Sequence, residues 1–402
     1  MVPASAGLKD PGARAQELLP DAFLTRIRQR AAEYDRNNSF FTEDFDQLRA
    51  AGYLTMQVPS ARGGAGFTLT EVARAQRRLA TAAPATALAV NMHLVWVAAA
   101  MAMTERGDHG LDLVIEGAAA GEVFAFGISE GGNDSVLFDS RTAAEPDGSG
   151  GYRYTGTKIF TSLAPAWTKL GIFGKDATDP DDPRLVYGFL DRAAAGYRIA
   201  DDWDPLGMRA TQSRSTVLTG AHVPASQIVR DLPVGPNADP LVFGIFSSFL
   251  TLVPSVYAGI ADRALALAVQ AVGQRSSMKF DGQKLSMDPD IRWKIADAAM
   301  LVDSMTLQLD GLTADVSAGP GSREHGADWF RQLAGLKTRV IADARRVVDL
   351  GLQVSGGASY TASSELSRLY RDVLAGIYHP SDDESAHSTV AQAVLGPLPT
   401  GQ

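Results

Sequence analysis

The sequence predicts a mainly α-helical α+β protein with an N-terminal helical domain, a central β barrel or sandwich and a C-terminal four-helix bundle. Three changes of pattern along the 402 residues support this order. Apolar residues recur at helical spacing over residues 21–121, short β-rich runs fill residues 122–235, and helical spacing returns over residues 236–402. We expect residues 1–20 to form a flexible leader, because prolines and charged residues interrupt them and no apolar run of signal-peptide length is present.

The N-terminal domain is predicted from one apolar helix face and a glycine-rich turn. Phe41, Phe45, Leu48 and Tyr53 recur at a spacing that places them on one side of a helical segment. A turn over residues 58–66 follows, and its three glycines are typical of a tight reversal of the backbone.

The central domain is predicted from short apolar runs with turn residues between them. Four such runs cover residues 123–128, 152–154, 170–173 and 185–190, and Gly, Pro, Asp and Asn separate them. Several short strands with frequent turns are typical of a small barrel or sandwich.

The C-terminal domain is predicted as a bundle of four long helices. Helical periodicity covers residues 241–274, 288–316, 327–355 and 364–378, and polar or Gly-rich links join these segments.

Two apolar stretches, residues 80–103 and 241–261, hold no charged residue and have the length of a membrane span. Both contain proline and polar residues, so we interpret them as buried helices. No membrane insertion is expected.

Composition excludes several classes of function. There are 37 Lys and Arg against 46 Asp and Glu, a net charge of -9, and no basic block, so nucleic acid is a poor candidate partner. Cysteine is absent, which excludes disulfides, thiolate metal sites and a cysteine nucleophile. This absence fits a cytoplasmic enzyme.

No pair of the six histidines has metal-ligand spacing with a supporting carboxylate, so we predict no metal site.

A small set of residues forms the candidate site. Glycine and serine let a backbone approach a ligand closely, and histidine can exchange protons near neutral pH. The residues are Ser129, Glu130 and Gly132 in one loop, Phe160 and Ser162 on one strand, Arg275 after a helix, Gln353, Gly356 and Gly357 at the end of another, and His379 near the C-terminus. Ser162 could instead cap a turn before Pro165.

In their order and spacing, these segments resemble the acyl-CoA dehydrogenase superfamily over about residues 40–396. The segments 204–213 and 353–360 match the family pattern well. The resemblance implies the acyl-CoA dehydrogenase fold, with a flavin between the β domain and the C-terminal bundle, and it favours FAD as that flavin.

The resemblance also implies a role for each site residue. It places Ser129, Glu130 and Gly132 at the flavin ring edge and pyrophosphate, Phe160 against the ring, and Ser162 near flavin N5. Arg275, Gln353, Gly356 and Gly357 would contact the FAD of a neighbouring subunit, which implies a homotetramer or homodimer.

The position of the catalytic base departs from the family pattern. Many dehydrogenases of this superfamily carry a glutamate where His379 stands, and the second family location, at residues 250–254, offers no carboxylate here. Imidazole can act as a base, with a free pKa near 6.5. The acidic run Asp382-Asp383-Glu384 could supply a replacement carboxylate, or it could be a solvated loop.

Three functions therefore stay open. The first is oxidation of the Cα–Cβ bond of an acyl thioester, with His379 as the base, hydride transfer to FAD N5 and an external electron acceptor. The second is a two-component monooxygenase that uses reduced FMN or FADH2 from a flavin reductase, together with O2, Ser162 and His379. The third is a non-catalytic flavin-binding paralogue.

Overall fold

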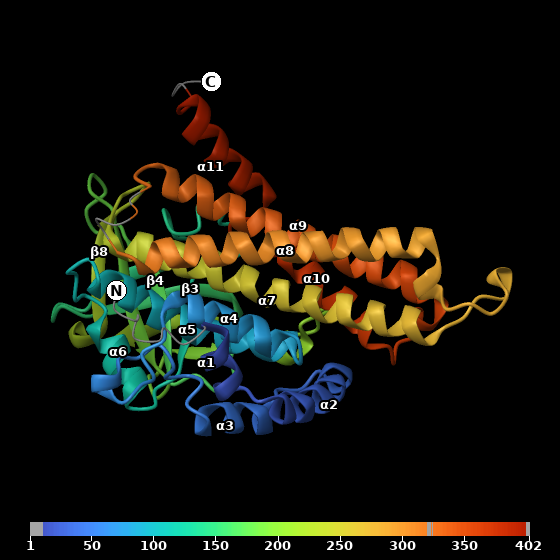
Figure 1. The fold of residues 1–402 in the computed structure, drawn as a ribbon. Coiled ribbons are helices and arrows are strands. Elements are labelled where there is room, and N and C mark those ends of the chain that lie inside the picture. The colour runs from blue at the N-terminus through green and yellow to red at the C-terminus, as the bar shows by residue number, and fades with distance from the viewer. Residues whose placement is uncertain (1–10, 320–322, 324, 399–402) are drawn as a thin grey trace, which may run out of the picture.

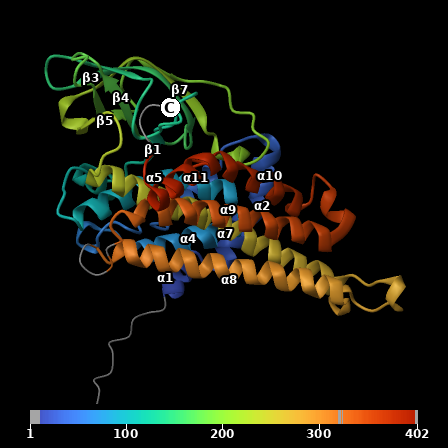
Figure 2. The same ribbon diagram turned by 90° about the horizontal axis from the view of Figure 1, so that it is seen from above.

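The computed structural model describes residues 11–319, 323 and 325–398. The α+β fold class is confirmed, with helices at both ends of the chain and one sheet between them. In Figure 2 the sheet lies on one side of the helical body. Beneath it run, side by side, the long helices α7 (Pro240–Gln274), α8 (Pro289–Ser317) and α9 (Asp328–Ser355).

The N-terminal helices surround an apolar core. They are α1 (Pro11–Leu18), α2 (Asp21–Asn37), α3 (Thr42–Ala50), α4 (Leu69–Ala80), α5 (Pro84–Thr104) and α6 (Asp112–Ala119), with the short 3-10 helix η1 (Ser60–Arg62) in the glycine-rich turn. The predicted apolar face is buried, because Phe41, Phe45, Leu48 and Tyr53 all belong to the main core.

The flexible-leader prediction is wrong for residues 11–20, which form α1 and the turn after it. Ala15 and Leu19 are buried against the main core. Arg14 donates a 3.0 Å hydrogen bond to Glu71 of α4, and its guanidinium lies 4.1 Å from the centre of the Phe67 ring. Contacts with residues more than 50 positions away stabilise this helix, and no local pattern reveals them. Residues 1–10 lie outside the described part of the chain.

The β domain is one sheet that folds over its own core. Its strands are β1 (Phe124–Gly127), β2 (Ala143–Pro146), β3 (Tyr152–Thr161), β4 (Lys169–Asp176), β5 (Arg184–Asp191), β6 (Tyr197–Ile199), β7 (Arg214–Val223) and β8 (Ile228–Pro233). The order is β6-β7-β3-β2-β4-β5-β8, with β1 parallel to β4. Tyr154 of β3 donates a 3.2 Å hydrogen bond to the Val186 carbonyl of β5, so two strands that are not neighbours in the sheet meet across a separate apolar core.

The C-terminal domain is built around the longest helix. Its helices are α7 (Pro240–Gln274), α8 (Pro289–Ser317), α9 (Asp328–Ser355), α10 (Glu365–Leu374) and α11 (Asp383–Leu395). In Figure 1, α7 runs through the middle of the molecule, and it packs against α4, α5, α8 and α9.

The two apolar stretches form α5 and α7, both long and apolar enough to cross a membrane by length and composition. Their most apolar windows are 94% and 89% buried inside the fold, which confirms the interpretation as core helices. Trp96 of α5 shows how closely α5 meets the sheet, because a β-carbon at Gly171 of β4 would overlap its indole ring.

Candidate active site

Two adjoining cavities lie where the β domain meets the helices. The inner cavity has a volume of about 270 Å³, the outer cavity has a volume of about 440 Å³, and Phe126, Ser129, Phe249 and Pro380 line both. The inner cavity is bounded by the ends of β1 and β3, the loop before β7, helices α5 and α7, and the segment after α10. The outer cavity is bounded by the loop after β1, by α7 and by α11. The two cavities therefore share part of their wall.

Phe160, in β3, and Ser162, directly after this strand, both line the inner cavity, and their contacts with a flavin ring stay predictions. The pairing of β3 with β7 is irregular between Lys158 and Thr161, and Phe160 has a φ of 55°. This local kink leaves the Phe160 ring 54% exposed, edge-on to Trp203 at 6.2 Å between ring centres. An apolar ring left uncovered in a cavity offers a contact surface for a flat aromatic ligand.

Ser162 begins a row of three hydroxyl groups along the cavity wall. Its Oγ lies 2.7 Å from Ser213 Oγ, which lies 2.7 Å from Thr211 Oγ1. Thr211 in turn donates a 2.8 Å hydrogen bond to the Met208 carbonyl. All three hydroxyl-bearing residues are buried and line the inner cavity. The sequence analysis singled out Ser162 but not its two partners.

His379 lines the same cavity from the segment after α10, and Tyr257 of α7 holds it. The Tyr257 hydroxyl is 2.6 Å from His379 Nε2. Burial raises the pKa of Tyr257 well above its usual value, so the phenol keeps its proton. Removal from bulk water, and then the Lys337 ammonium, lower the pKa of His379 to about 3, so the imidazole is neutral.

These two states fix the hydrogen positions. Tyr257 is fully buried and has no other hydrogen-bond partner among the described residues, so its O–H donates to His379 Nε2. A neutral imidazole has one accepting and one donating nitrogen, so the proton of His379 is on Nδ1. His379 thus keeps an N–H donor, while Tyr257 occupies its lone pair.

The two cavities differ in charge. No Asp or Glu occurs among the described residues that line the inner cavity, and the Arg371 guanidinium there is paired with Asp35. The outer cavity is lined by Asp134, Asp382 and Glu384, and by no Lys or Arg within the described chain. The outer cavity therefore favours a ligand with positive charge.

The acidic run Asp382-Asp383-Glu384 is not a loop, and its use as a replacement base stays a prediction. It begins α11, where Asp382 accepts a 2.9 Å hydrogen bond from the Ser385 amide. Carboxylates are favourable there because the first amides of a helix lack partners and carry partial positive charge.

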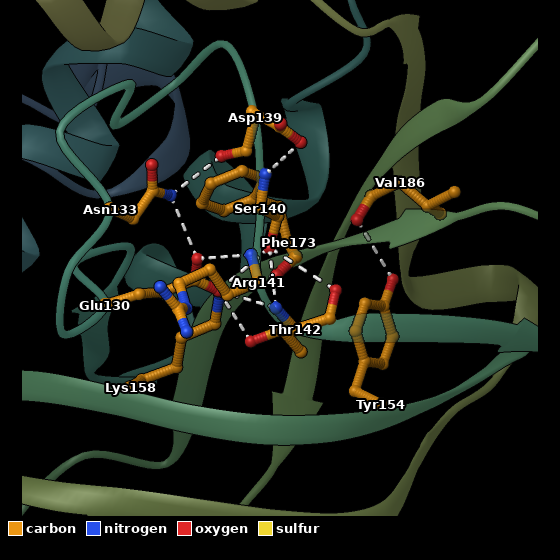
Figure 3. A network of polar contacts seen from close by, with 10 residues as sticks. All are labelled: Glu130, Asn133, Asp139, Ser140, Arg141, Thr142, Tyr154, Lys158, Phe173 and Val186. Atoms are coloured by element: carbon orange, nitrogen blue, oxygen red, sulfur yellow. Dashed lines mark hydrogen bonds and ion pairs between the residues drawn. The ribbon is translucent and has the colours of Figure 1, made fainter.

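Glu130 was predicted to contact the cofactor as part of its loop, and the structure shows that its carboxylate is already occupied. Its carboxylate is buried within the β domain, 2.6 Å from the Lys158 ammonium (Figure 3). It also accepts hydrogen bonds from the Thr142 hydroxyl at 2.6 Å and the Arg141 amide at 2.7 Å. Burial alone would raise the pKa of Glu130, but Lys158 and these donors outweigh it and lower the pKa to about 2. Both carboxylate oxygens are occupied, so the Glu130 side chain organises the loop. A contact between the backbone of this loop and a cofactor stays a prediction.

The remaining predicted cofactor residues do not line either cavity. Gly132 lies in the same loop as Glu130, and its carbonyl accepts from Arg141. Arg275 lies at the end of α7 and donates to the Ser355 carbonyl, beside Gly356. Gln353 is exposed and donates to Asp349 at 2.8 Å. The structure brings Arg275, Gly356 and Gly357 together with Gln353 at the ends of α7 and α9; their contact with a neighbouring subunit's FAD, and the oligomer it implies, stay predictions.

Gly207 fixes the floor of the inner cavity against α10, and a side chain there is expected to destabilise the protein. A β-carbon at Gly207 would overlap the backbone carbonyl of Arg371, and the next amide, of Met208, donates to Asp372 at 2.6 Å. Gly207→Ala should lower the free energy of unfolding in urea by about 1–3 kcal/mol through overpacking. The same substitution at Gly311, inside α8 with no atom within 4 Å of the new carbon, should raise stability by roughly 0.5–1 kcal/mol. Equal effects at both positions would contradict this account.

Two family models match the chain. The one described as acyl-CoA dehydrogenase, N-terminal domain, matches residues 15–109, and the one described as acyl-CoA dehydrogenase, C-terminal domain, matches residues 252–383. The chain is 30% identical over 374 residues to L-evernosamine nitrososynthase of a Micromonospora species, with 91% of this chain and 86% of that protein covered.

Solved structures give the same picture of the fold. KijD3 in complex with FMN and dTDP-3-amino-2,3,6-trideoxy-4-keto-3-methyl-D-glucose aligns with a TM-score of 0.85 at 29% identity, covering 99% of this chain and 97% of that one. Butyryl-CoA dehydrogenase from Megasphaera elsdenii aligns with a TM-score of 0.83 at 20% identity, over 97% and 99% of the two chains, which speaks for the fold alone.

Proposed function

The chain belongs to the acyl-CoA dehydrogenase superfamily, whose members include flavin-dependent oxidoreductases, and from that premise we propose that it is a flavin-dependent monooxygenase that oxidises the amino nitrogen of an amino sugar. The observation that carries this proposal is the state of His379. A dehydrogenase needs a base beside the substrate, whereas the lone pair of His379 is occupied by Tyr257 and the residue offers an N–H donor.

The residues of the inner cavity fit a flavin. An isoalloxazine ring has flat apolar faces and a polar edge. The half-exposed ring of Phe160 suits a face, and the hydroxyl of Ser162 suits the edge. FMN is bound by the structurally similar KijD3, so FMN joins FAD as a candidate for this chain.

In the proposed reaction, a reduced flavin supplies two electrons so that one atom of O2 enters the substrate and the other leaves as water. An N–H bond of the amine R–NH2 is replaced by an N–O bond, giving R–NHOH and oxidised flavin. A second O2 and a second reduced flavin would convert R–NHOH to R–N=O and two waters. The second product, a nitroso compound, is the class of product that the name of the nitrososynthase relative indicates.

The chain's own residues prepare the site for this reaction. Phe249, Leu88 and Met92 give the inner cavity apolar walls that limit water. His379 can donate its Nδ1–H to an oxygen atom of the reacting groups. Asp134 and Glu384 at the outer cavity attract a positively charged amino group, which supports an amine as substrate.

Oxidation of an acyl thioester is the second candidate, favoured by the family models and by the position of His379. It would require His379 to release Tyr257 and accept a carbon-bound proton. A pKa of about 3 makes it unfavourable for His379 to accept this proton, because its imidazolium would be far more acidic than an ordinary imidazolium with a pKa near 6.5.

The deciding experiment compares the two chemistries on one protein preparation. Purified enzyme is given FMN or FAD, a flavin reductase and NADH in air, with free and nucleotide-linked amino sugars, and products are measured by mass spectrometry. We expect a gain of one oxygen on the amine, dependent on both O2 and flavin reduction.

In parallel, the flavin-loaded protein is mixed with a panel of acyl-CoA thioesters without oxygen. We expect no bleaching of the flavin spectrum by the wild type. His379→Glu, which restores the family carboxylate, serves as the positive comparison. Bleaching of the wild-type spectrum by an acyl-CoA, with no oxygenated amine in the first assay, would refute the monooxygenase and establish the dehydrogenase.

A further inference from the structure

The three hydroxyl groups on the wall of the inner cavity can point in only one direction. Each hydroxyl has a single hydrogen to donate. The Met208 carbonyl can only accept, and it lies 2.8 Å from Thr211 Oγ1, so Thr211 donates to it. Ser213 must then donate to Thr211, and Ser162 must donate to Ser213, each across 2.7 Å.

The reverse order is unfavourable. If Ser162 kept its hydrogen for a ligand, only two hydrogens would remain for the three contacts, so one contact would always bring two lone pairs together. In the fully reversed order, Ser213 would donate to Ser162 and Thr211 would donate to Ser213. The lone pairs of Thr211 Oγ1 and the Met208 carbonyl oxygen would then face each other at 2.8 Å. Thr211 is fully buried, so water cannot relieve that repulsion.

The direction of the chain decides what Ser162 offers to a ligand. Its only hydrogen is used by Ser213, so the Oγ atom presents lone pairs to the inner cavity. Ser162 therefore accepts a hydrogen bond from a ligand N–H or O–H and opposes a ligand acceptor placed against it.

We infer that Ser213 and Thr211 make this cavity selective for reduced over oxidised flavin by fixing Ser162 as a hydrogen-bond acceptor. The inference rests on the proposed function, which sets a flavin ring against Ser162. Flavin N5 bears no hydrogen in the oxidised ring and accepts a hydrogen bond. In the reduced ring N5 bears a hydrogen and donates one. Ser213 and Thr211 are positioning residues, because they act through Ser162.

This selectivity suits a protein that receives reduced flavin from solution. A site that binds the reduced form more tightly fills with the form that reacts with O2 and releases the flavin after oxidation. One matched hydrogen bond in place of opposed lone pairs corresponds to about a tenfold difference in Kd.

The test is an anaerobic titration of the purified protein with FMN and with dithionite-reduced FMN, repeated with FAD, by calorimetry. The wild type is expected to bind the reduced flavin about tenfold more tightly than the oxidised flavin. In Ser213→Ala the hydrogen of Ser162 is free to turn toward the ligand, so the two dissociation constants should become nearly equal.

Three further variants separate polarity from packing. Thr211→Val removes the acceptor that fixes Ser213 and should also equalise the two constants, whereas Thr211→Ser keeps both hydrogen bonds and should behave as the wild type. Thr161→Val is the matched control next to Ser162, because the buried Thr161 hydroxyl has no hydrogen-bond partner in the described part of the chain and does not line the cavity. It should leave the ratio unchanged.

The possible failures are distinguishable. Equal binding of both flavin states by the wild type, or an unchanged preference in Ser213→Ala, would overturn the inference and leave the proposed function standing. A protein that binds neither FMN nor FAD in either state would overturn the proposed function, and the inference with it.

Discussion

Replacing His379 with glutamine is expected to keep turnover of the amine within about tenfold of the wild type, whereas replacing it with phenylalanine should lower kcat by roughly 10²–10⁴-fold. Glutamine retains an N–H donor but cannot act as a base. Phenylalanine keeps the approximate volume and removes both capacities. The comparison therefore asks directly whether His379 works through its hydrogen or through its lone pair.

The pH dependence of kcat gives an independent check on His379. A base with the ordinary pKa near 6.5 is active when unprotonated, so activity would fall as the pH drops through 6.5. With a pKa of about 3, His379 stays neutral from pH 5 to pH 8 and should add no inflection in that range. Equal loss of activity in the Gln and Phe variants, with an inflection near pH 6.5 in the wild type, would show that His379 is a base.

Glu130→Ala is expected to destabilise the protein by about 3–5 kcal/mol, because it leaves the Lys158 ammonium buried without a counter-charge. Lys158 is fully buried and its other hydrogen bond goes to the Phe173 carbonyl at 2.7 Å. The hydroxyls of Ser140 and Thr142 would lose an acceptor as well. Urea unfolding of the protein without flavin measures the loss.

Lys158→Met and Glu145→Ala complete the Glu130 experiment. Lys158→Met should cost less than Glu130→Ala, since Glu130 would keep its hydroxyl and amide donors. Glu145, exposed on β2, has no such network, and its replacement should change stability by no more than about 0.5 kcal/mol. If Glu130→Ala left the flavin-free protein as stable as the wild type and weakened only flavin binding, the predicted cofactor role of Glu130 would be restored.

Local patterns were sufficient to predict the architecture. Apolar residues at helical spacing marked residues 241–274 and 327–355, and the structure has α7 and α9 at Pro240–Gln274 and Asp328–Ser355. A helix or strand that packs on a core must repeat its apolar residues at its own period, so these elements are visible without knowing their partners. Phe160 and Ser162 were also found in the sequence, through their resemblance to a family strand, and both line the inner cavity.

Charged and polar residues were harder to interpret, because their roles depend on partners that are distant in the sequence. Glu130 has the position expected of a cofactor residue, yet Lys158, 28 residues later, takes its carboxylate. Tyr257 lies in an apolar helix with no sign of chemistry, and it determines the protonation of His379, 122 residues away.

The sequence by itself thus determined the order of helical and β domains, the superfamily and two walls of the cavity, since these follow from local periodicity and short motifs. Only the tertiary structure decided which nitrogen of His379 carries the proton, which way the Ser162 hydroxyl points and whether Glu130 is free to bind a ligand. Each of those depends on a hydrogen bond between distant segments, and the direction of a hydrogen bond is set by all the groups that share it.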